Sequence, residues 1–216
     1  LLRGWRGRDT LAGVDQMVVN RLSWLIGGAQ GSGINVSADV FARACKRAGL
    51  HVFSNIEYHS NITGKHAYYR VRVNQKDVRS PIDGADLLLA LDRESLFGDV
   101  DAPYQTHHGH VRQVVPDGGI IYDAELGVTP EEIGRDDVRL YPVPYGEVMK
   151  DALASGGIEY EPRRHDIMRN MISVAASFAL LEMDLDVIVD MLRERLGAHR
   201  QHLVGLNELV LNTTAN

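Results

Sequence analysis

Apolar and polar positions alternate along this chain in blocks that predict strands and helices in turn. A short apolar run at residues 22–26 leads into a glycine-rich turn, and apolar residues then recur at helical spacing over 36–48, before Gly49. Residues 86–91 are nearly continuous apolar sequence, which is typical of a strand covered on both faces. Strands that alternate with helices predict a three-layer α/β fold, with a mostly parallel central sheet and flanking helices.

The same patterns predict the remaining elements. In 67–73, alternation places Tyr68, Arg70 and Arg72 on a solvent-facing side, opposite the apolar residues. Asp92 is expected to cap a short helix that runs through Leu96. Further strands are predicted at 51–57, 120–123 and 138–143, and helices at 145–154, 167–182, 184–196 and 201–212. The last third of the chain is therefore expected to be helical.

Composition limits the classes of function. With 216 residues, 44% of them hydrophobic, the chain can bury one sizeable core. The formal net charge of −6 argues against nucleic acid as the main partner, and no apolar run is long enough to span a membrane. The single cysteine, Cys45, lies on an apolar helix stripe and is expected to be a buried, inert thiol. One cysteine excludes an internal disulfide, and it excludes an iron–sulfur cluster held by the chain's own thiolates. It also indicates a reducing compartment, so we expect a cytoplasmic protein.

The first residues have a different composition from the rest. Residues 1–16 carry three arginines but no apolar segment of the kind found in signal peptides. Met17 directly precedes the approach to the first strand. We therefore interpret residues 1–16 as a leader or cloning-derived segment, and residues 17–216 as one α/β domain.

The turn after the first predicted strand is the leading candidate for a binding site. Residues 27–33 contain four glycines and precede a helix, whose first turn presents backbone N–H groups that suit an anion. The candidate ligand-binding residues here are Gly28, Gln30, Gly31, Ser32 and Gly33. The spacing matches neither the Walker phosphate loop, which needs a lysine, nor the dinucleotide G-x-G-x-x-G pattern. A turn that needs glycine only for packing explains the pattern equally well.

A polar loop at residues 58–66 follows the second predicted strand. Its candidate binding residues are Ser60, Asn61, Thr63 and Lys65. Since ligands of parallel sheets sit outside the carboxyl ends of the strands, this loop and the glycine-rich turn are expected to converge on one cleft. A phosphorylated ligand fits a lysine beside a helix N-terminus, and an ordinary solvated loop is the alternative.

The sequence His107-His108-Gly-His110 suggests a metal site. The chain supplies neither paired cysteines nor a His-Glu-x-x-His helix, which are the usual companions of such histidines. We therefore interpret this stretch as a solvated loop and expect no metal ligands.

Four stretches together resemble the gamma domain of 2-oxoacid:ferredoxin oxidoreductases, in the form that begins a fused alpha subunit. The opening motif WLIGGAQGSGI at 24–34 and the loop EYHSNITGKH at 57–66 carry most of this resemblance. DLLLALD at 86–92 and MISVAASFALL at 171–181 fit later parts of the same domain. The resemblance extends over roughly 17–211.

The resemblance implies an accessory role in the oxidative decarboxylation of a 2-oxoacid to an acyl-CoA, with electrons passed to ferredoxin. Thiamine diphosphate, Mg²⁺, an iron–sulfur cluster and coenzyme A belong to the assembled enzyme, and none is expected to be held by this chain alone. The implied partners are a thiamine-binding subunit or domain and, through the complex, ferredoxin, in an oligomer. Pyruvate, 2-oxoglutarate, branched-chain and aryl oxoacids all remain open as substrates.

The chain also departs from the family pattern. It contains neither the Tyr-Pro-x-Thr-Pro stretch that opens the family's next domain nor the Gly-Asp-Gly…Asn pattern of the thiamine site. We therefore assign no catalytic residue and expect no activity from the chain alone, whether it is a separate subunit or a piece of a longer one. A stand-alone nucleotide- or CoA-binding module, and a non-catalytic interaction domain, are the alternatives.

Overall fold

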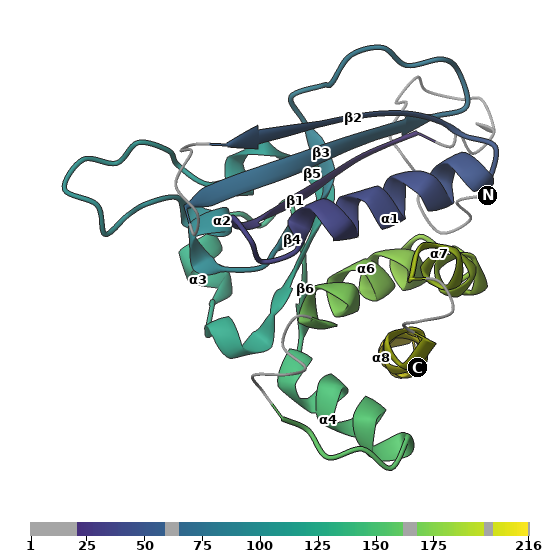
Figure 1. The fold of residues 1–216 in the computed structure, drawn as a ribbon. Helices are drawn as coiled ribbons and strands as arrows, with labels where there is room; N and C mark the ends of the chain where they lie inside the picture. Colours follow the sequence, from purple (N-terminus) through teal and green to yellow (C-terminus); the bar gives the residue numbers. More distant parts are fainter. Residues whose placement is uncertain (1–20, 59–64, 162–167, 197–200, 216) are drawn as a thin grey trace.

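A six-stranded sheet forms the centre of the protein (Figure 1). The computed structural model describes residues 21–58, 65–161, 168–196 and 201–215, so the expected leader at 1–16 lies outside the described residues. In spatial order the strands are β2 (His51–Tyr58), β3 (His66–Asn74), β1 (Leu22–Ala29), β4 (Ala85–Ala90), β5 (Val114–Asp123) and β6 (Arg139–Val143). The pairs β1–β4, β4–β5 and β5–β6 are parallel, while β3 runs antiparallel to both β2 and β1. The predicted mostly parallel α/β sheet is confirmed, with one antiparallel strand inserted as the second half of a β2–β3 hairpin.

Seven α-helices flank the sheet or follow it in the described part of the chain. They are α1 (Ile34–Arg47), α2 (Arg93–Phe97), α3 (Pro130–Ile133), α4 (Tyr145–Ser155), α6 (Arg169–Leu180), α7 (Asp186–Leu196) and α8 (Gln201–Ala215). The short 3₁₀ segments are η1 (Val111–Gln113) and η2 (Ala124–Leu126). The expected helical final third is confirmed, and α8 packs against α4, α6 and α7 (Figure 1).

Alternating side chains of the central strands divide the core into two layers. In β1, Trp24 and Ile26 face a cluster formed with α1, α6 and α7, whereas Leu25 faces a cluster formed with α2 and α3. Leu87 and Leu88 of β4 divide in the same way. Because successive strand residues point to opposite faces, a strand covered on both sides must be apolar throughout. This explains the nearly continuous apolar runs that predicted β1 and β4.

Three aromatic side chains connect the sheet to its helices. The Trp24 ring stacks on Phe41 of α1 with ring centroids 4.5 Å apart, and Phe41 meets Phe178 of α6 edge to face at 5.8 Å. The indole Nε1 of Trp24 donates a hydrogen bond to Ser177 Oγ at 3.1 Å, so the one polar atom of this buried ring has a partner. Cys45 lies fully buried in the same layer, and burial raises the pKa of its thiol to about 12, as expected for an inert cysteine.

The predicted solvent-facing side of β3 is wrong at Arg70. Its guanidinium is buried and donates hydrogen bonds of 2.8 Å to the carbonyl oxygens of Ile82 and Asp83 and to Gln113 Oε1. These acceptors belong to segments before β4 and β5 that close over β3. An arginine whose donors are satisfied in this way can be covered, although alternation alone predicts that it is exposed.

The connections reverse direction at the boundary between β1 and β4. From β1 the chain proceeds through α1 to β2 and β3 on one side, and from β4 it proceeds to β5 and β6 on the other side. In open α/β sheets the crevice outside the carboxyl ends of the strands at such a switch point is the usual place for a ligand. Among the described helices, none has the length and apolar character to cross a membrane.

Candidate functional site

The glycine-rich turn connects the carboxyl end of β1 to the start of α1. Gly31 and Gly33 adopt φ values of 91° and 96°, in the left-handed region that favours glycine, and the Ser32 amide donates to the Ala29 carbonyl at 3.0 Å. The N-cap residue, Gly33, has no side chain with which to cap α1, and the first turn of the helix contains no acidic residue. The partial positive charge of this helix end is therefore not offset by the helix's own first-turn side chains.

A pocket of about 670 Å³ opens beside this turn. It lies at the switch point, because it is bounded by the turn after β1, by the chain just beyond β4 and β5, and by the first residues of α4 and α6. Its lining residues are Gly31, Ser32, Leu91, Asp123, Glu125, Leu126, Tyr145, Arg169 and Asn170. The fold thus forms a partly polar cavity where the topology of the sheet predicts a ligand.

Side chains from the first turn of α6 form a wall of the pocket beside the turn. Arg169 makes an ion pair with Asp123, and a second with Glu125 at 3.0 Å. The Asn170 amide donates a hydrogen bond to the backbone carbonyl of Ser32. Asn170 therefore connects α6 directly to the turn. Two carboxylates oppose the single guanidinium, so an anionic ligand here would have to compete for Arg169 or use the helix end.

Tyr145 gives this wall a neutral hydroxyl. The side chain is buried, its hydroxyl hydrogen-bonds to Ser173 Oγ of α6, and burial raises the pKa of the phenol. At neutral pH Tyr145 is therefore a protonated hydrogen-bonding group, and it does not act as a base.

The structure brings the described parts of the two predicted loops together. The Gln30 amide donates to the Lys65 carbonyl at 2.8 Å, and Ala29 is paired with His66 across β1 and β3. Lys65 is exposed at this edge. Gly31 and Ser32 line the pocket, and Gly33 begins the adjacent helix.

Of the other predicted binding residues, Gly28 alone lies among the described residues. Gly28 is buried within β1, where a Cβ atom would come within 3.1 Å of the Leu91 and Ser32 side chains, so close packing favours a glycine here. Ser60, Asn61 and Thr63 lie outside the described residues. The sequence reasoning missed Arg169 and Asn170, although a polar pair at a helix start is a recognisable signal once that helix is known to face the pocket.

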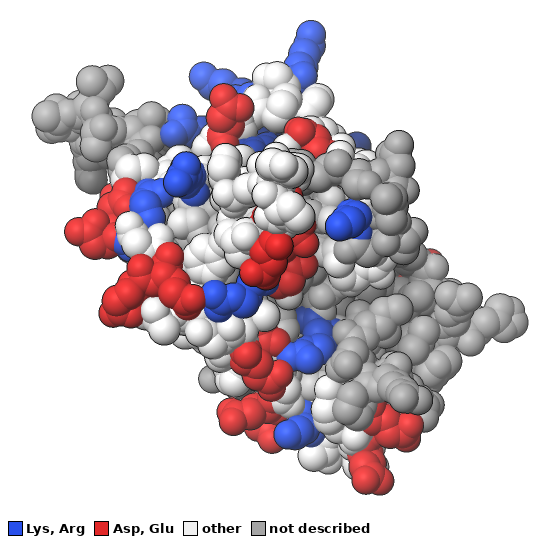
Figure 2. Space-filling view, turned by 90° about the vertical axis from the view of Figure 1, so that its left-hand side faces the viewer, with Lys and Arg blue, Asp and Glu red and all other residues white. Residues whose placement is uncertain are grey.

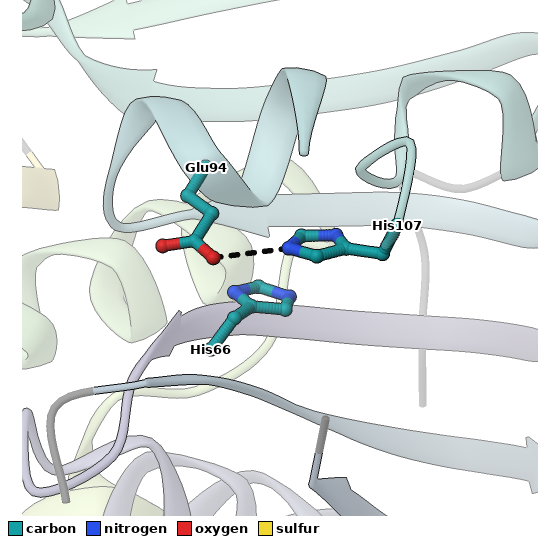
Figure 3. A group of neighbouring side chains, drawn as sticks. All are labelled: His66, Glu94 and His107. Carbon is teal, nitrogen blue, oxygen red and sulfur yellow. Dashed lines mark hydrogen bonds and ion pairs between the residues drawn. The ribbon is translucent and has the colours of Figure 1, made fainter. Parts of the chain in front are cut away.

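The interpretation of 107–110 as a solvated loop is wrong for two of its three histidines. His107 and His110 are 8% and 2% exposed, and only His108 is exposed. His107 stacks on His66 with ring centroids 4.6 Å apart, and its Nε2 lies 3.0 Å from Glu94 Oε1 (Figure 3). Sequence alone missed this cluster because its members come from β3, α2 and the segment after α2.

Acidic and basic side chains are interspersed on the face viewed in Figure 2. The described residues of this face form no large area of one sign. A duplex nucleic acid binder usually presents a continuous basic surface. The described residues of this one face show no such continuous basic area.

Comparison with known proteins relates the chain to one group of enzymes. It is 29% identical over 189 residues to subunit alpha of 2-oxoacid:ferredoxin oxidoreductase 1 from Sulfurisphaera tokodaii. This match covers 79% of this chain and 30% of that protein. It is 31% identical over 182 residues to subunit alpha of 2-oxoacid:ferredoxin oxidoreductase 2 from Aeropyrum pernix, covering 82% of this chain and 25% of that protein. The chain thus spans less than a third of the length of these curated relatives.

Solved structures share the fold. A 2-oxoglutarate:ferredoxin oxidoreductase from Magnetococcus marinus superimposes with a TM-score of 0.71 at 22% identity, over 90% of this chain and 30% of that chain. The gamma subunit of a keto/oxoacid ferredoxin oxidoreductase from Geobacter sulfurreducens gives 0.64 at 15% identity, over 90% of this chain and 96% of that chain. The model of the family described as pyruvate ferredoxin/flavodoxin oxidoreductase matches residues 23–215. Since this match covers most of its length, the chain belongs to the pyruvate ferredoxin/flavodoxin oxidoreductase family.

Proposed function

We propose that this chain is the gamma-type part of a 2-oxoacid:ferredoxin oxidoreductase, which oxidises a 2-oxoacid and coenzyme A to an acyl-CoA. Its role there is accessory: it helps to enclose coenzyme A beside a thiamine site that another subunit or domain provides. The observation that carries the proposal is the pocket of about 670 Å³ at the switch point, lined by Gly31 and Ser32 of the family's opening motif.

The helix end and the cations near the turn favour a phosphorylated ligand, although Asp123 and Glu125 of the pocket already pair with Arg169. The helix end at Gly33 offers backbone N–H groups, Arg169 lines the same pocket, and Lys65 is exposed at the same edge of the sheet. The solved structure of the Magnetococcus marinus enzyme has coenzyme A bound. By analogy, Gln30, Gly31, Ser32, Gly33 and Lys65 would contact coenzyme A here, with Lys65 on a phosphate.

The remaining cofactors are assigned to the partner. Cys45 does not fit a cluster ligand, because it is fully buried with a pKa raised to about 12, and a cluster needs about four thiolates. Thiamine diphosphate, Mg²⁺ and the cluster would therefore be held outside this chain, and the cluster would deliver electrons to ferredoxin. The lone cysteine agrees with a reducing compartment such as the cytoplasm.

The test is the substitution Lys65→Ala in the assembled enzyme, with Lys76→Ala as the matched control. Both lysines are exposed, but Lys76 follows the other end of β3. Lys65→Ala should raise the Michaelis constant for coenzyme A by up to about fivefold, because one exposed ion pair contributes at most about 1 kcal/mol. The Michaelis constant for the oxoacid should not change. Lys76→Ala should change neither constant.

Equal effects of the two substitutions on coenzyme A kinetics, with the assembly intact, would remove the role given to Lys65. The proposal also predicts that the purified chain alone does not turn over any 2-oxoacid with thiamine diphosphate, Mg²⁺, coenzyme A and a dye acceptor. Turnover under those conditions would contradict the accessory role.

A further inference from the structure

We propose that His66, Glu94 and His107 form a binding site for one divalent transition-metal cation of the Zn²⁺ class. The possible ligand atoms of these three residues all lie within 4.8 Å of one another (Figure 3). They come from separate segments, since His66 begins β3, Glu94 lies in α2 and His107 lies in the segment after α2. This site is separate from the pocket described above and does not depend on the proposed function.

The donor set has the composition of known metal centres. Two imidazoles and one carboxylate bind Zn²⁺ in several hydrolases and Fe²⁺ in oxygenases, and in both the coordination sphere keeps an open position. His66 and His107 are 1% and 8% exposed, whereas the Glu94 side chain is 38% exposed. The carboxylate thus lies at the solvent side of two buried imidazoles, which gives an ion a path of entry.

A second layer of contacts orients His66. Its Nε2 lies 2.9 Å from Nε2 of His110, which is also buried, and the edge of the Tyr68 ring packs on His110 with centroids 4.6 Å apart. In Figure 3 the other ring nitrogen of His66 faces Glu94. Metal-binding histidines usually direct one nitrogen to the ion and the other to a hydrogen-bonding partner, and His110 has that position.

The segment that carries His107 is closed on itself. The Asp99 carboxylate accepts hydrogen bonds from the His107 amide at 3.0 Å, from the Thr106 hydroxyl and from the Thr106 amide at 2.9 Å, and these bonds lower the pKa of Asp99. Gly98 lies against the His107 carbonyl, where a Cβ atom would overlap that carbonyl. These contacts hold the backbone of His107 in place, so we expect the residue to reorient by rotation of its ring.

Without an ion, the same residues form a hydrogen-bonded stack. The planes of the His66 and His107 rings are 11° from parallel, and two stacked imidazoles cannot both direct a lone pair at one ion. The Gly109 amide donates to Nδ1 of His107 at 3.3 Å, which places the ring proton on Nε2 against Glu94. Binding therefore requires one ring to rotate out of the stack and the Nε2 proton of His107 to leave to solvent, as His107 and Glu94 exchange their hydrogen bond for one bond each to the metal. This rotation gives metal binding a signature that a purely structural stack lacks.

The test uses the full chain, purified without a polyhistidine tag and stripped of metal with a chelator. Zn²⁺ alone is titrated in competition with a chromophoric chelator, and Co²⁺ reports coordination through its visible absorption. We expect one equivalent of Zn²⁺ to bind. Glu94→Gln and His107→Gln should each weaken binding at least about tenfold, and His110→Asn should weaken it by about 10–100-fold as the loss of an orienting partner.

The control is His108→Ala, because His108 lies in the same segment but is exposed. It should bind Zn²⁺ as the parent chain does. NMR signals of the His66 and His107 rings should shift on addition of Zn²⁺, while circular dichroism confirms that each variant is folded. Failure of the folded parent chain to bind Zn²⁺, or equal binding by Glu94→Gln, His107→Gln and the parent, would overturn the proposal, whatever the coenzyme A kinetics show.

Discussion

Replacing Gly33 with alanine tests whether the turn and α6 are energetically connected. Gly33 has φ 96° and ψ 9°, a left-handed conformation that costs an L-residue about 1–2 kcal/mol. Replacing a glycine also stabilises the folded state by about 0.4–1 kcal/mol, because the unfolded chain has less conformational entropy. The backbone contribution alone should therefore destabilise the fold by about 1 kcal/mol.

A second cost arises at Asn170. A Cβ atom on Gly33 would lie 2.9 Å from Asn170 Nδ2, the atom that donates to the Ser32 carbonyl. The amide must move away, and the loss of its hydrogen bond costs about 0.5–1.5 kcal/mol. Gly33→Ala should thus lower the free energy of unfolding by about 2 kcal/mol. Gly49→Ala is the matched control, because Gly49 has φ 82° and no atom within 4 Å of a Cβ there, so only the cost of about 1 kcal/mol applies.

Urea unfolding followed by circular dichroism measures both free energies, and a double-mutant cycle with Asn170→Ala isolates the contact. In the Asn170→Ala background, Gly33→Ala should cost no more than Gly49→Ala. The reasoning is refuted if Gly33→Ala and Gly49→Ala cost the same in the parent chain, or if the excess cost persists after Asn170 is removed.

Two further predictions concern the buried layer beside α1. Ser177→Ala should lower the free energy of unfolding by about 1–3 kcal/mol, because it leaves the buried indole N–H of Trp24 without its acceptor, whereas the exposed Ser54→Ala should change it by less than about 0.5 kcal/mol in urea unfolding. Burial raises the pKa of Cys45 from 9.0 to about 12, so between these pH values the unfolded chain releases a thiol proton that the folded chain keeps, and stability falls as pH rises. In the Cys45→Ala variant, the free energy of unfolding should fall less steeply with pH, by up to about 1.4 kcal/mol per pH unit. Equal slopes of unfolding free energy against pH for the variant and the parent across pH 9–12 would contradict this.

Local pattern predicted the elements well because both faces of the central strands are covered. Continuous apolar runs can form only a buried strand or a buried helix, and their short length decided between the two. The N-cap of α2 was also predicted correctly: the Asp92 carboxylate accepts a hydrogen bond from the Ser95 amide at 2.7 Å. β3 is antiparallel because it forms a hairpin with β2. The apolar–polar alternation of a strand does not indicate its direction in the sheet.

Burial of polar residues could not be predicted from the same pattern. Arg70 and His107 each occupy positions that alternation or loop composition assigns to solvent. Whether such a group is exposed depends on which distant segments fold over it and offer partners, as Ile82, Gln113 and Glu94 do. Sequence-based reasoning therefore located the turn side of the pocket but missed the α6 side and the whole histidine cluster.

Two consecutive glycines place the pocket and the histidine cluster on opposite faces of one strand. A Cβ atom on Gly27 would lie 2.9 Å from Ser95 Oγ and 3.2 Å from His66 Cε1, so the side of β1 that faces α2 lies against the cluster. A Cβ atom on Gly28 would lie 3.1 Å from Ser32 Oγ, on the side that faces the turn and α1. Successive residues of a strand face opposite sides of the sheet. A side chain at Gly27 would therefore press on Ser95 and His66, and one at Gly28 would press on Ser32. Close packing on both faces of β1 therefore favours glycine at 27 and 28, whether or not the turn that follows also binds a ligand.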